Sequence, residues 1–293
     1  MNIEGLSLDQ MRVALAVAST GSFSGAARHV RRAQSAVSYA ITSLEQQLGT
    51  VLFERSGQGA RVSAEGASLL AEMADIVGRA DGLKRRANAI AAGQEPLVRV
   101  SVDTLYDLPG SGPVWSAFAD AFPATRVAVT VETMQRVVDD VLDKRADLGL
   151  LASLSTVHPS LRSRSLSPIH LVPVASPGHP LAQASVFDDG AQHAHVQIVL
   201  GERMDAPPDE TYFAFASRTW RVTDLSTKLA MLRAGVGWGY MPRHAVDADI
   251  ADGTLVLLRA EGLPMTDPQP VFALWKQDTP AGPCVRWLVD HLT

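Results

Sequence analysis

Polar side chains gather on one face of a helix that the sequence predicts over residues 34–48. The buried face of this helix is defined by apolar residues at spacings of 4, 3 and 4, namely Val37, Ile41, Leu44 and Leu48. The opposite face carries Gln34, Ser35, Ser38, Tyr39 and Thr42. A glutamine can make paired hydrogen bonds to the edge of an adenine, and short serines let a helix axis come close to the bases of a major groove. The pattern fits a DNA-reading helix, and it fits equally well a plain polar surface on a three-helix bundle.

Four arginines flank this helix in the sequence. Arg31 and Arg32 come directly before it, while Arg55 and Arg61 lie on either side of a glycine-rich turn at residues 57–59. The turn separates a short apolar strand at 51–53 from a return strand that ends at Val62, which predicts a wing-type hairpin. Guanidinium groups in such places can reach the DNA backbone and add affinity without reading sequence. The complete set of predicted DNA contacts is Ser22, Ser24, Arg31, Arg32, Gln34, Ser35, Ser38, Tyr39, Thr42, Arg55 and Arg61.

Two further helices must position the polar face. A first helix is predicted by an apolar stripe at Leu8, Met11, Leu15 and Ala18. Gly21 ends it, and Ser22 or Ser24 can cap a short second helix over 23–30. Residues 31–33 then form a tight connection to the helix at 34–48, which Gly49 stops as a C-cap. Two short helices joined by a three-residue turn are typical of a helix-turn-helix whose second helix enters a major groove.

A long helix capped by Ser63 follows the hairpin. Its apolar residues alternate spacings of 4 and 3 over three heptads, the pattern of a coiled-coil seam: Leu69, Met73, Ile76, Ala80, Leu83, Ala87 and Ile90. A small winged domain cannot cover so long and narrow a stripe, so the sequence predicts pairing with the same helix of a second chain. Two recognition helices would then face successive turns of the duplex. Packing of the stripe on the C-terminal domain is the alternative.

Charge is divided unevenly along the chain. The 293 residues carry a formal net charge of -5, which argues weakly against a nucleic-acid partner. Residues 1–63 hold six arginines, no lysine and four acidic residues, whereas residues 96–293 hold 16 basic and 22 acidic residues. The acidity therefore belongs to the C-terminal part and does not weigh against DNA binding by the N-terminal part. The single cysteine, Cys284, excludes an intrachain disulfide, and the N-terminus lacks the features of a signal peptide, so we expect a cytoplasmic protein without a membrane span.

Strands and helices alternate after a helix-breaking segment that ends in a hinge at residues 93–96. Apolar runs predict strands over 97–102, 126–132 and 148–151, with helices over 115–122 and 134–144 between them. This βαβαβ order predicts a parallel sheet covered by helices. A second unit begins near Pro168, with strands over 169–175, 195–200, 220–222 and 236–241 and a helix over 225–234. A strand over 271–275 and a helix that runs to Leu292 follow it.

Open α/β sheets bind ligands at the carboxyl ends of their strands. The side chains predicted to contact a small-molecule effector there are Asp103, Thr104, Thr133, Ser153 and Thr223, with Trp238 as a stacking surface. A helix N-cap is the alternative role for Asp103, and aromatic residues such as Trp220 and Trp238 are more often part of a core. If Asp103 does contact the effector, that molecule is not a plain carboxylate but offers a hydroxyl or a cation.

Motifs of common enzyme classes do not occur in the sequence. There is no Gly-x-Ser-x-Gly, P-loop, HExxH or CxxC, and the glycines at 235–239 lack dinucleotide-binding spacing. The eight histidines are scattered, and Cys284 precedes an amphipathic helix as a small core residue would. We therefore expect no catalytic residues, no metal site and no cofactor. A solute-binding protein, the other alternative, would need an export signal.

The first third of the chain resembles the DNA-binding region of LysR-type transcriptional regulators. The resemblance rests on the runs GSFSGAARHV at 21–30, QSAVSYAITSLEQQLGTVLFER at 34–55 and VSAEG at 62–66. The segments RADLGLL, LVPVASPGHPLA and AGVGWGYMP resemble the C-terminal domain of the same family more loosely. The chain departs from the family pattern at Gln58, where a basic residue is frequent, at Ser63 in place of threonine and at Val30 in place of leucine.

The resemblance implies an α/β protein with four parts. These are a winged helix-turn-helix over residues 1–63, a dimerisation linker helix over 64–92, the hinge at 93–96 and an effector-binding domain over 97–293. That domain is expected to be like a periplasmic binding protein, with lobe I over about 97–166 and 268–293, lobe II over about 167–267, and the effector between them. The implied protein is a transcriptional regulator and not an enzyme. Its implied partners are double-stranded DNA, a small-molecule effector, a second copy through the linker helix, a homotetramer and RNA polymerase.

Overall fold

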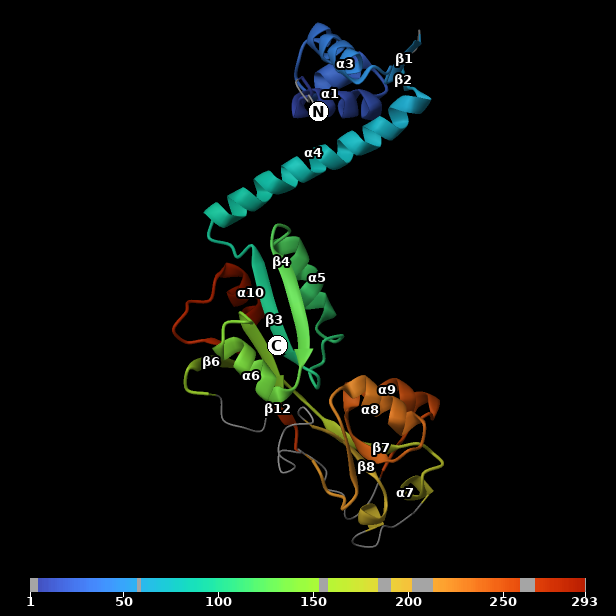
Figure 1. The fold of residues 1–293 in the computed structure, drawn as a ribbon, viewed down its shortest axis with the longest axis vertical. Helices are drawn as coiled ribbons and strands as arrows, with labels where there is room; N and C mark the ends of the chain where they lie inside the picture. Colours follow the sequence, from blue (N-terminus) through green and yellow to red (C-terminus); the bar gives the residue numbers. More distant parts are fainter. Residues whose placement is uncertain are drawn as a thin grey trace. The chain divides into compact units, whose positions relative to one another are not determined.

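The chain divides into two compact units, Met1–Asn88 and Ala89–Thr293. The computed structural model describes residues 5–56, 59–152, 158–183, 191–201, 213–258 and 267–292. Figure 1 shows a helical first unit that ends in the long helix α4, and a second unit built from sheets and helices. The predicted mixed α/β architecture is confirmed.

Three short helices form the body of the first unit. They are α1 (Leu8–Thr20), α2 (Phe23–His29) and α3 (Gln34–Leu48). Ser7 and Gln10 cap α1 reciprocally, and Gly21 ends it in the left-handed conformation at φ 66°. Ser22, rather than Ser24, caps α2, because its hydroxyl accepts the N–H of Gly25. The buried faces of the helices meet in one apolar core that includes Val17, Ala26, Val37, Ile41 and Leu44.

A hairpin and a long helix complete this unit. β1 (Phe53–Ser56) pairs antiparallel with β2 (Gly59–Val62), and α4 spans Ala64–Ala91. The predicted strand start at Val51 is wrong, because the partner strand ends at Val62 and the N–H of Leu52 donates to the carboxylate of Glu45 instead. Ser63 caps α4 as expected, with its hydroxyl accepting the N–H of Gly66 at 2.9 Å.

The first sheet of the second unit has the strand order β4-β3-β5-β12-β6. Its strands are β3 (Leu97–Asp103), β4 (Arg126–Glu132), β5 (Leu148–Ala152), β6 (Leu161–Ile169) and β12 (Gln269–Lys276). β3 pairs parallel with β4 and β5, as the βαβαβ pattern predicts, but β12 runs antiparallel to both β5 and β6. The complete sheet is therefore mixed rather than parallel.

Helices cover both faces of this sheet. α6 (Met134–Leu142) packs Val137 and Val141 with Leu151 and Leu274 on one face. α5 (Gly112–Ala121) and α10 (Pro283–His291) pack on the other face, where the rings of Phe118 and Trp287 lie 5.7 Å apart. We call this sheet with α5, α6 and α10 the first lobe.

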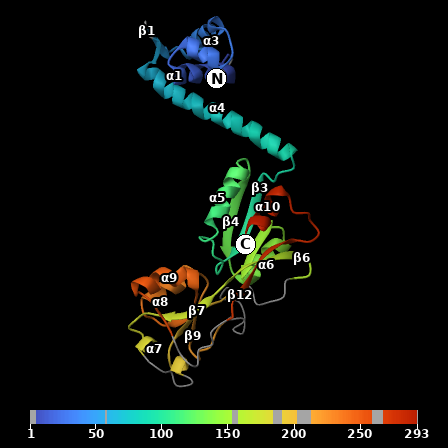
Figure 2. The ribbon, with the colours of Figure 1, turned by 180° about the vertical axis from the view of Figure 1, so that it is seen from behind.

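The second sheet has the order β11-β7-β10-β8-β9 and is drawn from behind in Figure 2. Its strands are β7 (Leu171–Ala175), β8 (Gln197–Leu200), β9 (Thr219–Val222), β10 (Trp238–Pro242) and β11 (Val256–Leu257). The helices are α7 (Pro180–Gln183), α8 (Leu225–Arg233) and α9 (Arg243–Asp252), with a 3₁₀ turn at Ala191–Ala194. We call this sheet with α7, α8 and α9 the second lobe.

Several described elements were not predicted from the sequence, among them α7, the 3₁₀ turn at Ala191–Ala194, β11, β6 and α9. β6 alternates buried Leu161, Leu166 and Ile169 with polar residues too irregularly to mark a strand. α9 carries few apolar residues, and only Val246 and Asp249 of it are buried. The chain passes from the first lobe to the second between Ile169 and Leu171, and β12 brings it back from Gln269.

Candidate functional site

The polar face of α3 is open to solvent. Gln34, Ser35 and Thr42 are exposed, Ser38 is half-buried, and Tyr39 leaves 78% of its surface exposed. Within the described part of the chain, none of these five side chains makes a hydrogen bond. When a partner with a polar surface covers this face, the tyrosine ring is removed from water and the unbonded polar side chains gain hydrogen-bond partners. The face is thus available for an external partner.

The predicted phosphate contacts divide into free and engaged groups. Arg31 and Arg61 are exposed, and Arg31 has an unusual positive φ of 54° in the turn before α3. Arg32 instead forms a bidentate ion pair with Asp9 at 2.6 and 2.9 Å, which lowers the pKa of that carboxyl. Sequence reasoning missed this pair because Asp9 lies on α1, far away in the chain. Arg55 is in β1, and Gln58 lies outside the described residues.

The predicted dimerisation residues of α4 fall into two groups. Met73 is only 4% exposed and packs in the core of the first unit with Leu70 and Val77, so its assignment to a dimer seam is wrong. Leu69 is partly buried against the same core. Further along the helix Ala80 is half-buried and Ala87 is exposed, while Ile76, Leu83 and Ile90 are 45%, 64% and 56% exposed. The monomer therefore covers the start of the stripe and leaves the remainder largely open.

A pocket in the second unit is lined by residues of both lobes. The first lobe contributes Asp103, Thr104, Leu105, Thr133, Met134 and Ala152, and the second lobe with its adjoining segments contributes Leu171, Leu200, Gly201, Phe213, Lys228, Tyr240 and Gln269. Asp103 and Thr133 stand at the carboxyl ends of β3 and β4, as expected for a ligand site in an α/β sheet.

Two other predicted effector contacts, Thr223 and Trp238, do not join this pocket. Thr223 is exposed and lies outside the lining, although Lys228 of the helix that follows it is part of the lining. Trp238 is completely buried in the core, so the stacking role is wrong and the core alternative is right. Its neighbour Tyr240, two residues further along β10, lines the pocket. Ser153 lies outside the described residues.

Asp103 is a buried carboxyl with one unsatisfied oxygen. Its side chain is 1% exposed, its Oδ1 accepts the N–H of Leu105 at 2.9 Å, and its Oδ2 has no hydrogen-bond partner among the described residues. Burial raises the pKa of Asp103 to about 7, against the opposing effect of the Leu105 N–H. The N-cap interpretation is wrong, because residues 104–106 form a turn and the next helix begins only at Gly112.

Lys228 is the matching cation in the second lobe. It is 4% exposed on α8, burial alone lowers its pKa to about 7, and no hydrogen bond or ion pair joins its ammonium to another described residue. The sequence does contain a sign that this lysine is buried. Lys228 occupies the same face as Leu225 and Leu232, at spacings of 3 and 4, where a buried helix face normally has an apolar residue.

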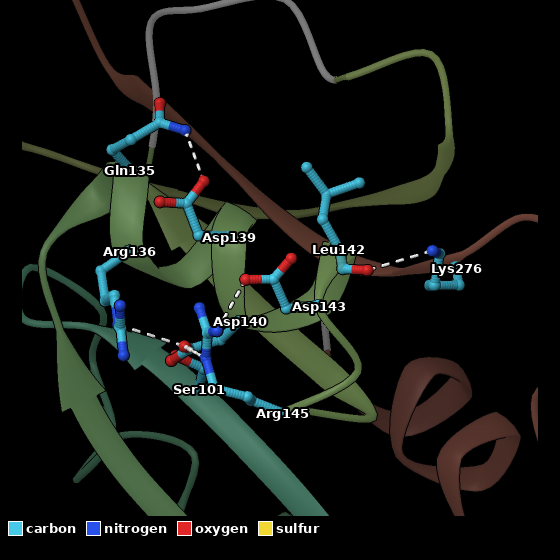
Figure 3. Close-up of polar contacts among 9 residues, drawn as sticks. All are labelled: Ser101, Gln135, Arg136, Asp139, Asp140, Leu142, Asp143, Arg145 and Lys276. Carbon is cyan, nitrogen blue, oxygen red and sulfur yellow. Dashed lines mark hydrogen bonds and ion pairs between the residues drawn. The ribbon is translucent and has the colours of Figure 1, made fainter.

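Polar contacts fix α6, whose N-terminal end brings Thr133 and Met134 to the pocket. Figure 3 shows Asp140 at the centre of these contacts, where it accepts from Ser101 of β3 at 3.0 Å and from Arg145 at 2.8 Å. Arg136 adds an ion pair at 3.2 Å to the same carboxylate. These contacts join α6 to β3, the strand that ends in Asp103, and so hold the pocket residues Thr133 and Asp103 in a fixed relation to each other.

An exposed recognition face in one unit and a pocket between two lobes in the other define a class of protein, the effector-responsive DNA-binding regulators. Residues 8–67 match the description "Bacterial regulatory helix-turn-helix protein, lysR family", and residues 91–293 match "LysR substrate binding domain". The chain belongs to the LysR family of bacterial regulators. It is a DNA-binding transcriptional regulator with an effector-binding domain.

Known relatives match this chain over nearly its whole length. The HTH-type transcriptional regulator AceR of Acinetobacter baumannii is 27% identical over 97% of this chain and 95% of its own length. The probable HTH-type transcriptional regulator YhaJ of Escherichia coli is 28% identical over 98% of this chain and 96% of its own. A full-length OxyR variant from Pseudomonas aeruginosa shares the fold with a TM-score of 0.54 at 19% identity, covering 98% of this chain and all of that one. AceR and YhaJ are both named as transcriptional regulators and not as enzymes.

Two further features concern the residues that the structure describes. No group of three or more histidine, cysteine, aspartate or glutamate side chains there could hold a metal ion. No helix there is long and apolar enough to cross a membrane.

Proposed function

We propose that the exposed face of α3 reads the operator and that a small molecule in the interlobe pocket controls how the protein sits on it. The observation that carries the first half is a recognition helix whose five outward side chains make no internal hydrogen bond. Gln34 and Ser38 are the base-reading residues in this proposal, and Tyr39 and Thr42 extend the contact along the groove.

Phosphate contacts come from the arginines that have no carboxylate partner. Arg31 and Arg61 fill this role, and exposed Arg28 near the end of α2 joins them. Arg32 is already neutralised by Asp9, so we expect it to orient α1 against the turn before α3 more than to bind DNA. We also include Arg55 among the proposed phosphate contacts because of its position in strand β1 of the hairpin. These contacts add affinity that falls with salt concentration.

Pairing of two chains through α4 is proposed for the exposed part of its apolar stripe. Ile76, Leu83 and Ile90 recur every seven residues and are each at least 45% exposed, which is costly in water and typical of a seam that a second copy covers. A homotetramer built from such dimers, RNA polymerase as a further partner and a cytoplasmic location follow from a role in controlling bacterial transcription.

The DNA-reading proposal is tested with sequences selected by the purified protein from a random library. Gln34→Ala should reduce the preference for the selected site over scrambled DNA by roughly 5- to 100-fold, the equivalent of one bidentate base contact, while scrambled DNA binds nearly as before. Ser38→Ala should have the same direction with a smaller effect. Gln47→Ala is the matched control, because this exposed glutamine of α3 lies outside the polar face. Full discrimination in gel shifts by both variants would show that another surface reads the operator.

A further inference from the structure

Two buried ionisable side chains line the pocket between the lobes, an acidic one from the first lobe and a basic one from the second. Asp103 is 1% exposed with an unpartnered Oδ2, and Lys228 is 4% exposed without a partner among the described residues. Apart from the phenol of Tyr240, they are the only ionisable side chains among the described residues that line the pocket. Buried ionisable groups without partners are rare, since each costs several kcal/mol unless something compensates it.

The two groups are not compensated by each other. Burial accounts for the shifted pKa of Lys228 without a contribution from Asp103, and the pKa of Asp103 is shifted by burial and by backbone N–H groups only. An ion pair would drive both pKa values the other way. Among the described residues, the Asp103 carboxyl therefore offers an acceptor oxygen that no donor occupies, and the Lys228 amino group offers a donor without an acceptor.

The chemistry of the occupant follows from this arrangement. A plain carboxylate would satisfy Lys228 but place its charge in a pocket that still contains Asp103, and a plain amine would satisfy Asp103 and leave Lys228 unpaired. A molecule with both groups satisfies both sites and leaves the charge of the pocket unchanged. Apolar side chains at Leu105, Met134, Leu171, Leu200 and Phe213 line the same pocket, so we expect the body of the molecule to be apolar.

We propose that the effector is a zwitterionic amino acid or close analogue with an apolar side chain, whose ammonium binds Asp103 and whose carboxylate binds Lys228. This inference rests on the proposed role of the pocket as the effector site. Because the two anchors belong to different lobes, such a molecule would bind better when the lobes approach one another, which couples occupancy to the arrangement of the domain.

Calorimetric titration of the full-length protein tests the proposal with probes that differ by one group. One series is leucine, 4-methylpentanoate, 3-methylbutylamine and 2-hydroxy-4-methylpentanoate, and a second is phenylalanine, 3-phenylpropanoate, 2-phenylethylamine and 3-phenyllactate. In at least one series the amino acid should bind at least tenfold more tightly than the acid, the amine and the hydroxy acid, the effect of one charge-assisted contact.

Two variants assign the groups. Asp103→Asn should remove most of the preference over the acid, and Lys228→Met should remove most of the preference over the amine. Asp120→Asn and Lys144→Met are the matched controls, because these side chains are exposed on the first lobe and outside the pocket. Both controls should keep the wild-type order of affinities.

The outcomes separate this inference from the proposed function. An acid or hydroxy acid that binds as tightly as its amino acid, and whose binding is weakened by Lys228→Met, would keep the pocket as the effector site and overturn the zwitterion. Failure of every probe to bind would also overturn it, while the operator-binding test on Gln34 stands unaffected. An amino acid that binds equally well to wild type and to both pocket variants would place its site elsewhere and overturn both ideas about this pocket.

Discussion

Replacement of Asp103 by asparagine should change how the stability of the second unit depends on pH. The ordinary pKa of 3.8 rises to about 7 in the folded protein because the carboxyl is buried. Between these two values the folded protein holds a proton that the unfolded chain has lost. The free energy of unfolding supplied by Asp103 is therefore fully present below about pH 4 and is lost as the pH rises through about 7. Asparagine keeps the shape of the side chain and does not titrate.

The magnitude follows from the size of the shift. Each pKa unit corresponds to about 1.4 kcal/mol. Between pH 5 and pH 8 the stabilisation falls only until the pH reaches the folded pKa of about 7, which is about two units. The wild type should therefore lose about 3 kcal/mol relative to Asp103→Asn over this range. In a unit of about 200 residues each kcal/mol moves Tm by roughly 2 to 4 °C. The difference in Tm between variant and wild type should therefore change by roughly 6 to 12 °C in favour of the variant.

Tryptophan fluorescence during thermal unfolding is a selective assay for this effect. All five tryptophans lie in the second unit, at Trp115, Trp220, Trp238, Trp275 and Trp287, so unfolding of the first unit does not contribute. Asp120→Asn, which removes an exposed carboxylate from α5, provides the control and should follow the wild type at both pH values. A Tm difference for Asp103→Asn that is the same at pH 5 and pH 8 would refute the claim that burial holds the proton on this carboxyl.

Two other predictions concern the buried lysine and the linker helix. The lowered pKa of Lys228 means that the unfolded chain binds the extra proton between about pH 7 and 10.5, so wild-type stability should rise by about 3 kcal/mol relative to Lys228→Met from pH 7.5 to 9.5, measured by the same fluorescence assay. A constant gap between the two proteins would contradict the claim that burial lowers the pKa of Lys228. Ile76→Asp with Leu83→Asp should convert dimers to monomers in light scattering, because both side chains are exposed on the seam, whereas Ala71→Asp with Arg85→Asp on the opposite face should not. Persistent dimers in the seam variant would mean that the chains pair through another surface.

Local sequence patterns were sufficient to predict most of the secondary structure of the first unit. The helices over 8–20, 23–29 and 34–48 follow from apolar spacing and from caps such as Ser22 and Gly49, all within a few residues of the structure they specify. The polar face of α3 is visible for the same reason. The ion pair of Arg32 with Asp9 could not be read in this way, because it joins two helices whose packing angle no local pattern encodes.

The stripe on α4 shows where periodicity stops being informative. Spacings of 3 and 4 place Met73 and Ile76 on one line, yet Met73 is in the core of its own unit and Ile76 is 45% exposed. Periodicity tells which residues share a face and does not tell what covers that face. The division between intramolecular core and open seam depends on where the three-helix body ends against α4.

For this chain, sequence alone was sufficient to predict the helix-turn-helix, the alternating architecture after residue 96 and the position of Asp103 and Thr133 at strand ends. Each of these depends on periodicity, capping or chain order, which act over short distances. Tertiary structure decided the antiparallel return of β12, the burial of Trp238 and the meeting of Asp103 with Lys228 in one pocket. Those features join residues more than a hundred positions apart or depend on what lies above a strand, and they arise only when the two lobes pack their apolar faces and exclude water from the groups between them.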